Sequence, residues 1–571
     1  MTAAEIRQRV PAAPLQFAAD LHPVLKRVYS SRGLTCSADL DLSLERMLPV
    51  GSLAGVEAAA ELLAAHRASG RVLIIGDFDA DGATATALMV RALRAMRFAH
   101  VDFLVPNRFR FGYGLTPEIV ALAATRRPSL IVTVDNGVSS VAGVQAARDL
   151  GVPVLVTDHH LPGLELPPAA VIVNPNLAGA EFASSALAGV GVAFYVIAAL
   201  ARRLQPENFR AAALLDLVAL GTVADVVPLD FNNRVLVAQG LQRIRAGRCV
   251  PGIRALLEAA GRRLEQATAA DLGFAVAPRL NAAGRLTDMS IGIACLIAED
   301  PAEAAGLAGQ LAKLNEERRE IEQRMQLEAL DIVATLSASR EQSPGLCLFD
   351  ESWHQGVVGL VAGRIKDRLH RPVIAFARAE DGSLRGSARS VSGVNIRDAL
   401  DTIAARHPGL IEKFGGHAMA AGMSLPAANL AKFRAAFAAE MAARTDAESL
   451  AGVIHSDGEL SAAELCIGTA RVLRSGGPWG QGFPEPLFDG EFQIAEARIV
   501  GNKHLKMQLK AMRGLPQRDP IEAIAFGYIG GAAQHADMGV GARIRLAYRL
   551  EVNDYRGNER VQLNCQHFWL T

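Results

Sequence analysis

Residues 152–160 read Val-Pro-Val-Leu-Val-Thr-Asp-His-His, an uncharged run rich in valine that ends in three polar side chains. Such a run predicts a buried parallel strand, because strands covered on both faces are apolar along their whole length. Open α/β sheets place their chemistry at the carboxyl ends of these strands. Asp158, His159 and His160 are therefore expected to emerge together at that edge, either as ligands or as hydrogen-bonded loop residues.

Three further apolar runs also end in acidic residues. With the acids that follow each, they are Arg71–Gly76 (Asp77, Asp79, Asp81), Leu130–Val134 (Asp135) and Leu214–Val223 (Asp225). The last run is expected to be helical in part. Converging aspartates would repel one another unless something positive lay between them, and a divalent metal ion is the simplest candidate.

The spacing of these elements predicts an α/β fold with a doubly wound parallel sheet. Helical segments over 83–94 and 138–150 follow the first two acidic motifs, and strand–turn–helix units of this length build such sheets. Gly82 and Gly137 stand where a tight strand-to-helix turn needs a residue without a side chain. The acidic motifs are therefore expected to meet at one edge of one sheet.

Three different patterns follow this domain along the chain. From Pro301, apolar residues at helical spacing predict a connecting helix of roughly 35 residues. A strand over 345–349 begins a second α/β domain, whose glycine-rich segments would let a phosphate approach the backbone, or would serve only tight turns. After about Leu450, alternating strands broken by glycine predict a small barrel.

At 571 residues the chain is too long for one core. The expected domains are an N-terminal extension over 1–68, a catalytic domain over 69–300, the connecting helix over 301–340, a substrate-binding domain over 341–450 and a barrel over 451–571.

Composition narrows the function classes only a little. Lys and Arg number 59 and Asp and Glu also 59, so nucleic-acid binding has to be argued from local segments. Six cysteines without a Cys-x-x-Cys spacing argue for a reducing compartment and against structural zinc. The first residues lack the apolar core of a signal peptide, so a cytoplasmic location is expected. The apolar window over 186–201 is too short to span a bilayer and predicts a buried helix.

Two segments outside the acidic motifs favour phosphate or base contacts. Residues 103–114 alternate aromatic and basic side chains without an acid, which suits phosphate capture and base stacking, although a surface loop with inward aromatics is the alternative. Residues 278–285 set two arginines and an asparagine around a predicted small-residue turn. The candidate substrate-binding residues are Arg108, Arg110, Tyr113, Arg279, Asn281, Ser387, Arg389 and His417.

The four acidic motifs, taken in this order, resemble the DHH phosphoesterase superfamily. Residues 415–422, Gly-Gly-His-Ala-Met-Ala-Ala-Gly, are similar to its accessory DHHA1 domain, and the terminal barrel is similar to the OB type. The likeness covers about residues 40 to 571. Within the superfamily it implies a single-strand-specific 5′-to-3′ DNA exonuclease that releases 5′-mononucleotides in DNA repair and recombination.

The resemblance also implies two Mn²⁺ or Mg²⁺ ions. Asp79 and Asp135 would hold one ion, and Asp81, Asp135, His159 and Asp225 the other, with Asp135 bridging. Asp77 and Asp158 are expected to be close supports. Oxygen ligands with one imidazole suit these ions, which can activate a water between them. His160, outside this ligand set, is expected to stabilise charge on the phosphoryl oxygens or the leaving group.

The implied partners are single-stranded DNA with a 5′ end, single-strand binding protein and a RecQ-type helicase, and the chain is expected to act as a monomer without a membrane. A small-substrate DHH phosphodiesterase is the alternative enzyme, but such relatives are shorter and lack the barrel; a pyrophosphatase fits less well. A replication scaffold with decayed ligands is the non-catalytic alternative. Every proposed ligand is present here.

Overall fold

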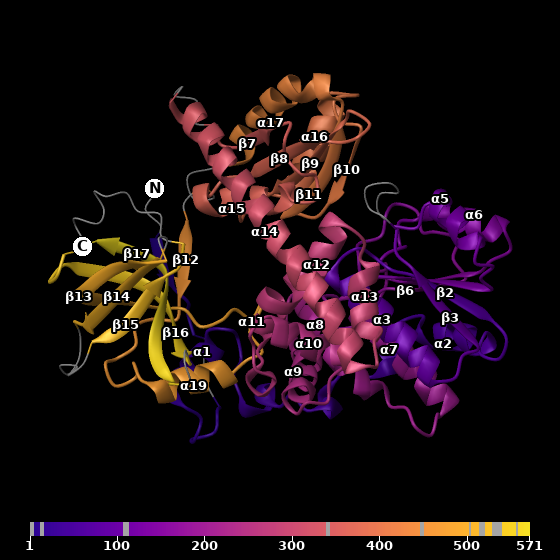
Figure 1. Ribbon diagram of the computed structural model, residues 1–571, viewed down its shortest axis with the longest axis horizontal. Helices are drawn as coiled ribbons and strands as arrows, with labels where there is room; N and C mark the ends of the chain where they lie inside the picture. Colours follow the sequence, from indigo (N-terminus) through magenta and orange to yellow (C-terminus); the bar gives the residue numbers. More distant parts are fainter. Residues whose placement is uncertain are drawn as a thin grey trace. The chain divides into compact units, whose positions relative to one another are not determined.

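The computed structural model describes residues 5–11, 16–106, 114–338, 343–445, 450, 452–501, 504–512, 520–527, 539–554 and 558–570. Their contacts form two compact units. The large unit comprises Gln8–Lys313 and His455–Thr571, and the small unit comprises Met1–Arg7 and Leu314–Ile454. The long helix α14 (Pro301–Ala338) contains the division between them, and its 38 residues confirm the predicted connecting helix (Figure 1).

A five-stranded parallel sheet organises the large unit. Its order is β3-β2-β4-β5-β6, so the chain winds outward from β2 in both directions, as predicted. β4 and β5 are buried at every position, which explains why the sequence shows continuous apolar runs there. The strands are β2 (Arg71–Ile75), β3 (His100–Leu104), β4 (Leu130–Val134), β5 (Val154–Thr157) and β6 (Val171–Val173).

The part of the large unit before the barrel is otherwise mainly helical. Its helices are α1 (Pro23–Ser30), α2 (Val56–Ala65), α3 (Ala80–Ala95), α5 (Pro117–Ala124), α6 (Val141–Asp149), α7 (Gly189–Leu204), α8 (Leu215–Ala224), α9 (Phe231–Arg245), α10 (Pro251–Ala259), α11 (Ala269–Asp271), α12 (Ala277–Leu286) and α13 (Ser290–Ile297). The apolar window over 186–201 lies mostly in α7 and is buried, as predicted.

Two sequence interpretations change in the structure. The run before Asp225, which was expected to be helical in part, is the helix α8. Its apolar composition left the choice open, because an apolar run by itself does not distinguish a buried helix from a strand. The predicted turn over 278–285 was wrong: these residues lie in α12, which follows directly on the π-helical turn Leu272–Val276, and Pro278 is in its first turn.

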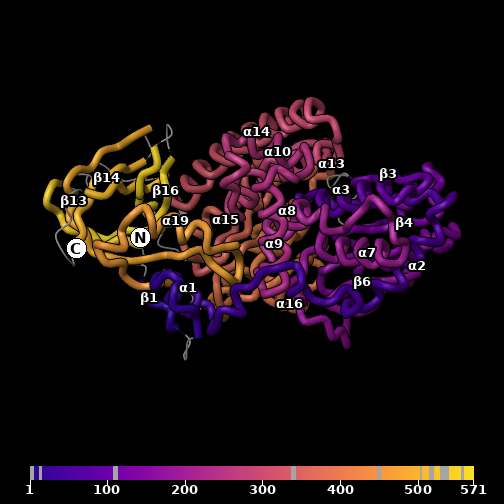
Figure 2. The backbone as a smooth tube through the Cα atoms, turned by 90° about the horizontal axis from the view of Figure 1, so that it is seen from below, coloured from indigo at the N-terminus to yellow at the C-terminus, as the bar shows by residue number. Residues whose placement is uncertain are grey.

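The carboxyl-terminal part of the large unit is a closed barrel of order β13-β14-β15-β17-β16, which confirms the predicted barrel. Its strands are β13 (Phe488–Val500), β14 (His504–Ala511), β15 (Ile521–Ala525), β16 (Arg543–Asn553) and β17 (Arg560–Leu570). Phe488, Phe492 and Tyr548 fill its interior. Helix α19 (Ile467–Ser475) packs on β16, and Figure 2 traces both.

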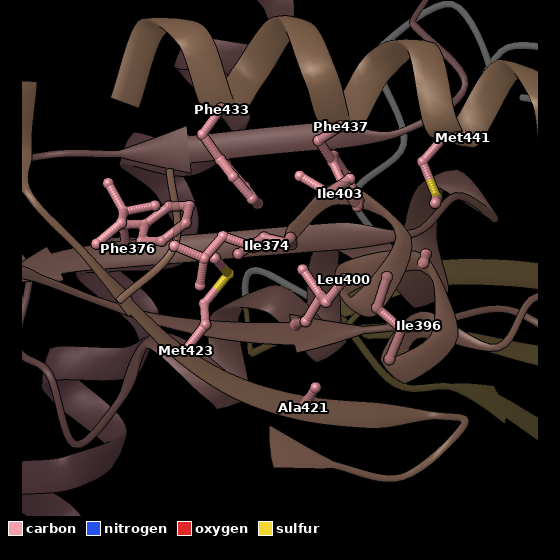
Figure 3. Packing of buried hydrophobic residues seen from close by; sticks show 14 of the residues in the cluster. Ile374, Phe376, Ile396, Leu400, Ile403, Ala421, Met423, Phe433, Phe437 and Met441 are labelled. Carbon is pink, nitrogen blue, oxygen red and sulfur yellow. The ribbon is translucent and has the colours of Figure 1, made fainter. Parts of the chain in front are cut away.

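The small unit is built on a mixed sheet of order β10-β11-β9-β8-β7. Figure 3 shows Phe433, Phe437 and Met441 of α17 packed over Ile374 and Phe376 of the sheet. Its elements are β7 (Leu346–Phe349), α15 (Val358–Leu369), β8 (Val373–Arg378), β9 (Leu384–Arg389), α16 (Ile396–Arg406), β10 (Lys413–Gly416), β11 (Ala420–Leu425) and α17 (Leu430–Arg444). At the two points where the chain passes from the small unit into the large one, β1 (Glu5–Gln8) pairs with β12 (Val453–Ser456).

Within the described ranges, no single helix has both the length and the apolar composition to cross a membrane. One bent pair, Leu44–Ser52 with Val56–Ala65, passes that test by length and composition only.

Candidate active site

The carboxyl ends of three neighbouring strands deliver the predicted acidic motifs to one place. Asp77 follows β2, Asp135 follows β4, and the segment 158–160 follows β5. Asp225 joins them from the carboxyl end of α8. Candidate ligand atoms lie within 4.8 Å of one another in three groups: Asp77, Asp79 and Asp135; Asp81, His159 and Asp225; and Asp135, His159 and His160.

Two of the acids are held by helix amino termini. Asp79 caps α3 and accepts a hydrogen bond from the Gly82 amide at 3.0 Å. Asp81, in the first turn of α3, accepts from the amides of Gly189 at 2.7 Å and Val190 at 2.9 Å, where α7 begins. The unsatisfied amides of a helix start favour negative charge, so these contacts fix the direction of both carboxylates.

Asp135 lies at the centre of the cluster. The Nε2 atom of His159 is 3.1 Å from Asp135 Oδ1 and 3.5 Å from Asp225 Oδ2. Asp135 has φ of 62°, a left-handed conformation that is uncommon for residues other than glycine and often marks functional sites. Backbone strain is therefore stored at the residue predicted to bridge the metals.

His160 is paired with Asp158. Its Nδ1 lies 2.8 Å from Asp158 Oδ1, and Asp158 Oδ2 accepts from the Val138 amide at 2.9 Å. Burial by itself would lower the pKa of His160, but the hydrogen bond to Asp158 and its charge outweigh burial and raise that pKa to about 9. The same pairing holds the pKa of Asp158 below its usual range despite burial. Asp158 thus supports the imidazolium form of His160.

The remaining carboxylates are electrostatically unfavourable without a cation. Burial, followed by the charge of Asp79, raises the pKa of Asp81 to about 7. Burial and the neighbouring acids, Asp81 first, raise the pKa values of Asp135 and Asp225 well above their usual range. Carboxylate oxygens with an imidazole are the donors that Mn²⁺ and Mg²⁺ accept, so the residues present fit a divalent metal centre.

Two glycines complete the site, although neither was predicted to belong to it. A Cβ at Gly189 would lie 2.6 Å from Asp135 Oδ1, and one at Gly221 would lie 2.7 Å from Asp81 Oδ1. Helices α7 and α8 approach the carboxylates this closely only because these positions lack side chains. The sequence offered one signal for Gly221, which lies four residues before Asp225 in the apolar run that leads to this acid.

Two asparagines were also missed. Asn174 Nδ2 donates to the His160 carbonyl at 2.9 Å, and Asn176 Nδ2 donates to the His159 carbonyl at 2.6 Å. They follow β6, so the rule that found the other motifs, polar residues after a parallel strand, could have found these as well.

Two of the large-unit substrate candidates, Asn281 and Arg279, make protein contacts. Asn281 Oδ1 accepts from the Ala80 amide at 2.8 Å, next to Asp79. Arg279 Nη1 donates to the Ala275 carbonyl at 2.6 Å. Arg108, Arg110 and Tyr113 lie outside the described residues.

In the small unit, Ser387 and Arg389 stand together on β9. Arg389 Nη1 donates to Ser387 Oγ at 3.0 Å. A Cβ at Gly359, in the first turn of α15, would lie 2.7 Å from Ser387 Oγ and 2.9 Å from Arg389 Nη2. The His417 amide donates at 2.8 Å to the carbonyl of Ala420, the β11 residue paired with Arg389. The structure therefore brings these three candidates to one part of the sheet.

Comparison with known proteins accounts for this arrangement. Three family models match: the DHH family, N-terminal domain, over residues 71–222; the DHHA1 domain over 342–443; and the RecJ OB domain over 456–567. The single-stranded-DNA-specific exonuclease RecJ of Escherichia coli (strain K12) is 50% identical over 576 residues, which cover 99% of both chains. This chain belongs to the RecJ family.

Solved RecJ structures agree with the fold. RecJ of Thermus thermophilus in complex with Mn²⁺ matches with a TM-score of 0.81 at 31% identity, over 99% of this chain and 80% of that one. An exonuclease RecJ bound to manganese matches with a TM-score of 0.59 at 36% identity, over 70% of this chain and 97% of that one. The predicted DHH, DHHA1 and OB-type parts and the Mn²⁺ or Mg²⁺ cofactor are confirmed, and the chain is a metal-dependent nuclease of the DHH phosphoesterases.

Proposed function

We propose that this chain hydrolyses single-stranded DNA from its 5′ end and releases 5′-mononucleotides. One observation carries the proposal: the buried acids and paired histidines meet at one sheet edge, in a chain that matches RecJ exonucleases over its whole length. A short-substrate phosphodiesterase would not account for the barrel that follows.

Asp79 and Asp135 would hold one Mn²⁺ or Mg²⁺ ion, and Asp81, Asp135, His159 and Asp225 the other. Asp77 shares a group of close ligand atoms with Asp79 and Asp135, which supports its place beside the first ion. Such ions, when bound, lower the pKa of a water between them and offset charge on the phosphate. The chain's own part is to hold these oxygens at fixed positions.

We assign His160 to the reacting phosphate. Asp158 orients the imidazole through Nδ1 and stabilises its protonated form. A positioned imidazolium can donate to a phosphoryl oxygen or to the leaving oxygen, and groups of this kind contribute ~10²–10⁴-fold to turnover. Asp158 is then a positioning residue for His160.

Recognition of the 5′ end is assigned to Ser387 and Arg389. The guanidinium and hydroxyl face the first turn of α15, whose backbone amides are a ready site for a phosphate. Gly359 permits this approach. We keep Arg108 and Arg279 as further candidates for the terminal phosphate, and Arg110, Tyr113, Asn281 and His417 for the nucleotides next to it.

We further propose that the chain works in the cytoplasm as a monomer, with single-strand binding protein and a RecQ-type helicase as partners. A helicase would expose the single-stranded ends that a single-strand nuclease needs.

The test is hydrolysis of one single strand labelled at either end, in Mn²⁺, with a blunt duplex of the same sequence as control. We expect a 5′ label to leave at once as mononucleotide, a 3′ label to remain on steadily shorter strands, and the duplex to persist. Release of the 3′ label first, or internal fragments from both strands, would contradict the proposal.

A further inference from the structure

The π-helical turn Leu272–Val276 presents an exposed aromatic side chain. Phe274 is 77% exposed, whereas Ala275 and Val276 beside it are buried. Leaving a phenylalanine in water forgoes stabilisation, and π-helical turns are frequent at functional sites. Among the described residues, Phe526 of the barrel is the other phenylalanine that is mostly exposed. Packing does not account for the position of Phe274.

This turn is fixed against the helix that ends at the metal site. A Cβ at Gly273 would lie 3.1 Å from Val223 Cγ1, two residues before Asp225. Arg279 donates to a carbonyl of the turn at 2.6 Å, which secures it from the other side. Val226, directly after Asp225, is exposed and has φ of 62°, an outlier for a β-branched residue. Strain and exposure therefore coincide where the chain leaves the metal ligands.

Val226 and Phe274 both line a cavity of about 810 Å³. The loop around Trp479 and the end of β16 line it as well, so residues next to the metal-site helix and residues of the barrel share one cavity within the large unit. Ligand-binding cavities commonly have volumes of ~300–1,000 Å³.

The charges of this cavity favour an anion. Five arginines and four carboxylates line it. Arg262 is paired with Asp271 at 3.2 Å. Arg245 donates to a backbone carbonyl at 2.8 Å, and Arg474 donates to the carbonyl and side-chain amide oxygen of Gln266, so neither of these hydrogen bonds neutralises its charge. Arg549 is paired with Glu485 at 2.6 Å, so the two ion pairs leave three arginines facing two carboxylates.

We propose that the DNA strand crosses this cavity between the metal centre and the barrel, and that Phe274 stacks on one of its bases. The residue after Asp225 lines the cavity, its arginines suit phosphates, and the ring suits any base face. This inference rests on the proposed exonuclease function and adds to it a specificity-determining residue. A single strand offers open base faces for stacking, whereas a duplex does not.

The test measures binding without turnover. A long 5′-phosphorylated oligonucleotide with a 3′ fluorophore is titrated by anisotropy, in EDTA, with wild type, Phe274→Ala, Phe274→Trp and Leu150→Ala. Leu150 is the matched control, because it is 57% exposed and lies outside the cavity lining. Phe274→Ala is expected to weaken binding roughly 5- to 150-fold, the range for one stacked base. Phe274→Trp should bind like wild type, and Leu150→Ala should bind unchanged.

Turnover on a 5′-phosphorylated dinucleotide, which has only one nucleotide beyond the bond that is cut, separates this role from a structural one. Phe274→Ala should keep its kcat/KM on the dinucleotide and lose it on the long strand. Wild-type binding by Phe274→Ala, or equal losses on both substrates, would overturn the stacking role. A wild-type protein that binds the strand as described but does not hydrolyse it would instead contradict the exonuclease function and leave the stacking role standing.

Discussion

A buried ion pair between Asp457 and Arg32 joins the N-terminal segment to the chain that enters the barrel. Arg32 Nη1 and Nη2 lie 2.8 and 3.0 Å from the two carboxylate oxygens, and Ser31 Oγ and the Leu487 amide donate to them at 2.8 and 3.0 Å. The side chains of Arg32 and Asp457 are 1% and 0% exposed. The pair is therefore desolvated and fully engaged.

Asp457→Asn leaves the guanidinium of Arg32 buried without its counter-charge, so we expect the free energy of unfolding of the large unit to fall by about 3–5 kcal/mol. The matched control is Asp102→Asn. Asp102 lies 2.7 Å from Arg126, but these side chains are 61% and 39% exposed, and exposed pairs contribute about 0–1 kcal/mol. The two variants differ in burial rather than in distance.

The assay is urea unfolding followed by the fluorescence of Trp479, whose ring lies 5.3 Å from the Arg32 guanidinium carbon. The other two tryptophans, Trp353 and Trp569, are replaced by phenylalanine in every variant.

Burial would raise the pKa of Asp457, but the hydrogen bond and charge of Arg32 outweigh burial and lower it. A lowered carboxylate pKa gives stability that is present above the unfolded pKa of ~3.9 and lost as pH falls through the folded value.

The difference between wild type and Asp457→Asn should therefore be full at neutral pH and shrink below pH ~4. A loss no larger than that of Asp102→Asn, or a difference that persists unchanged into strong acid, would refute this reasoning.

His160→Ala should reduce turnover by ~10²–10⁴-fold with Mn²⁺ affinity nearly unchanged in calorimetry, whereas His159→Ala should weaken Mn²⁺ binding itself; weakened binding in both would place His160 among the ligands. Arg389→Ala should erase the preference for 5′-phosphorylated over 5′-hydroxyl ends in kcat/KM, and an unchanged preference would place the terminal phosphate elsewhere. Gly189→Ala puts a methyl group 2.6 Å from an oxygen of the bridging carboxylate and should weaken Mn²⁺ binding at least about tenfold (~1.4 kcal/mol). The control Gly363→Ala, whose added methyl group meets nothing within 4 Å, should leave Mn²⁺ binding unchanged. Equal Mn²⁺ affinity of the two variants would contradict the close approach of α7.

The strands that carry the acids could be predicted from the sequence because burial on both faces leaves a continuous apolar run. The run Leu130–Val134 matches β4 at both ends for this reason. Periodicity cannot separate a short apolar helix from a strand, so α8 before Asp225 was only partly anticipated. The small residues Ala282, Ala283 and Gly284 indicated a turn, but they are buried within α12.

Contacts between segments far apart in sequence were beyond prediction. The amides of Gly189 and Val190 donate to Asp81, which lies more than a hundred residues earlier in the sequence, and no local sequence pattern predicts these hydrogen bonds. The exposure of Phe274 also depends on tertiary packing, since its neighbours Ala275 and Val276 in the turn are also apolar but buried.

The most direct test of the metal-centre assignment is turnover of a 5′-phosphorylated single strand in Mn²⁺ by Asp135→Ala, measured beside thermal unfolding of the metal-free protein. Asp135 is buried among like charges that raise its pKa, so its removal should leave the metal-free fold at least as stable as wild type. Hydrolysis should fall below about one hundredth of wild type, because loss of the bridging carboxylate uncouples both ions. A folded Asp135→Ala protein with activity above that level would contradict the assignment.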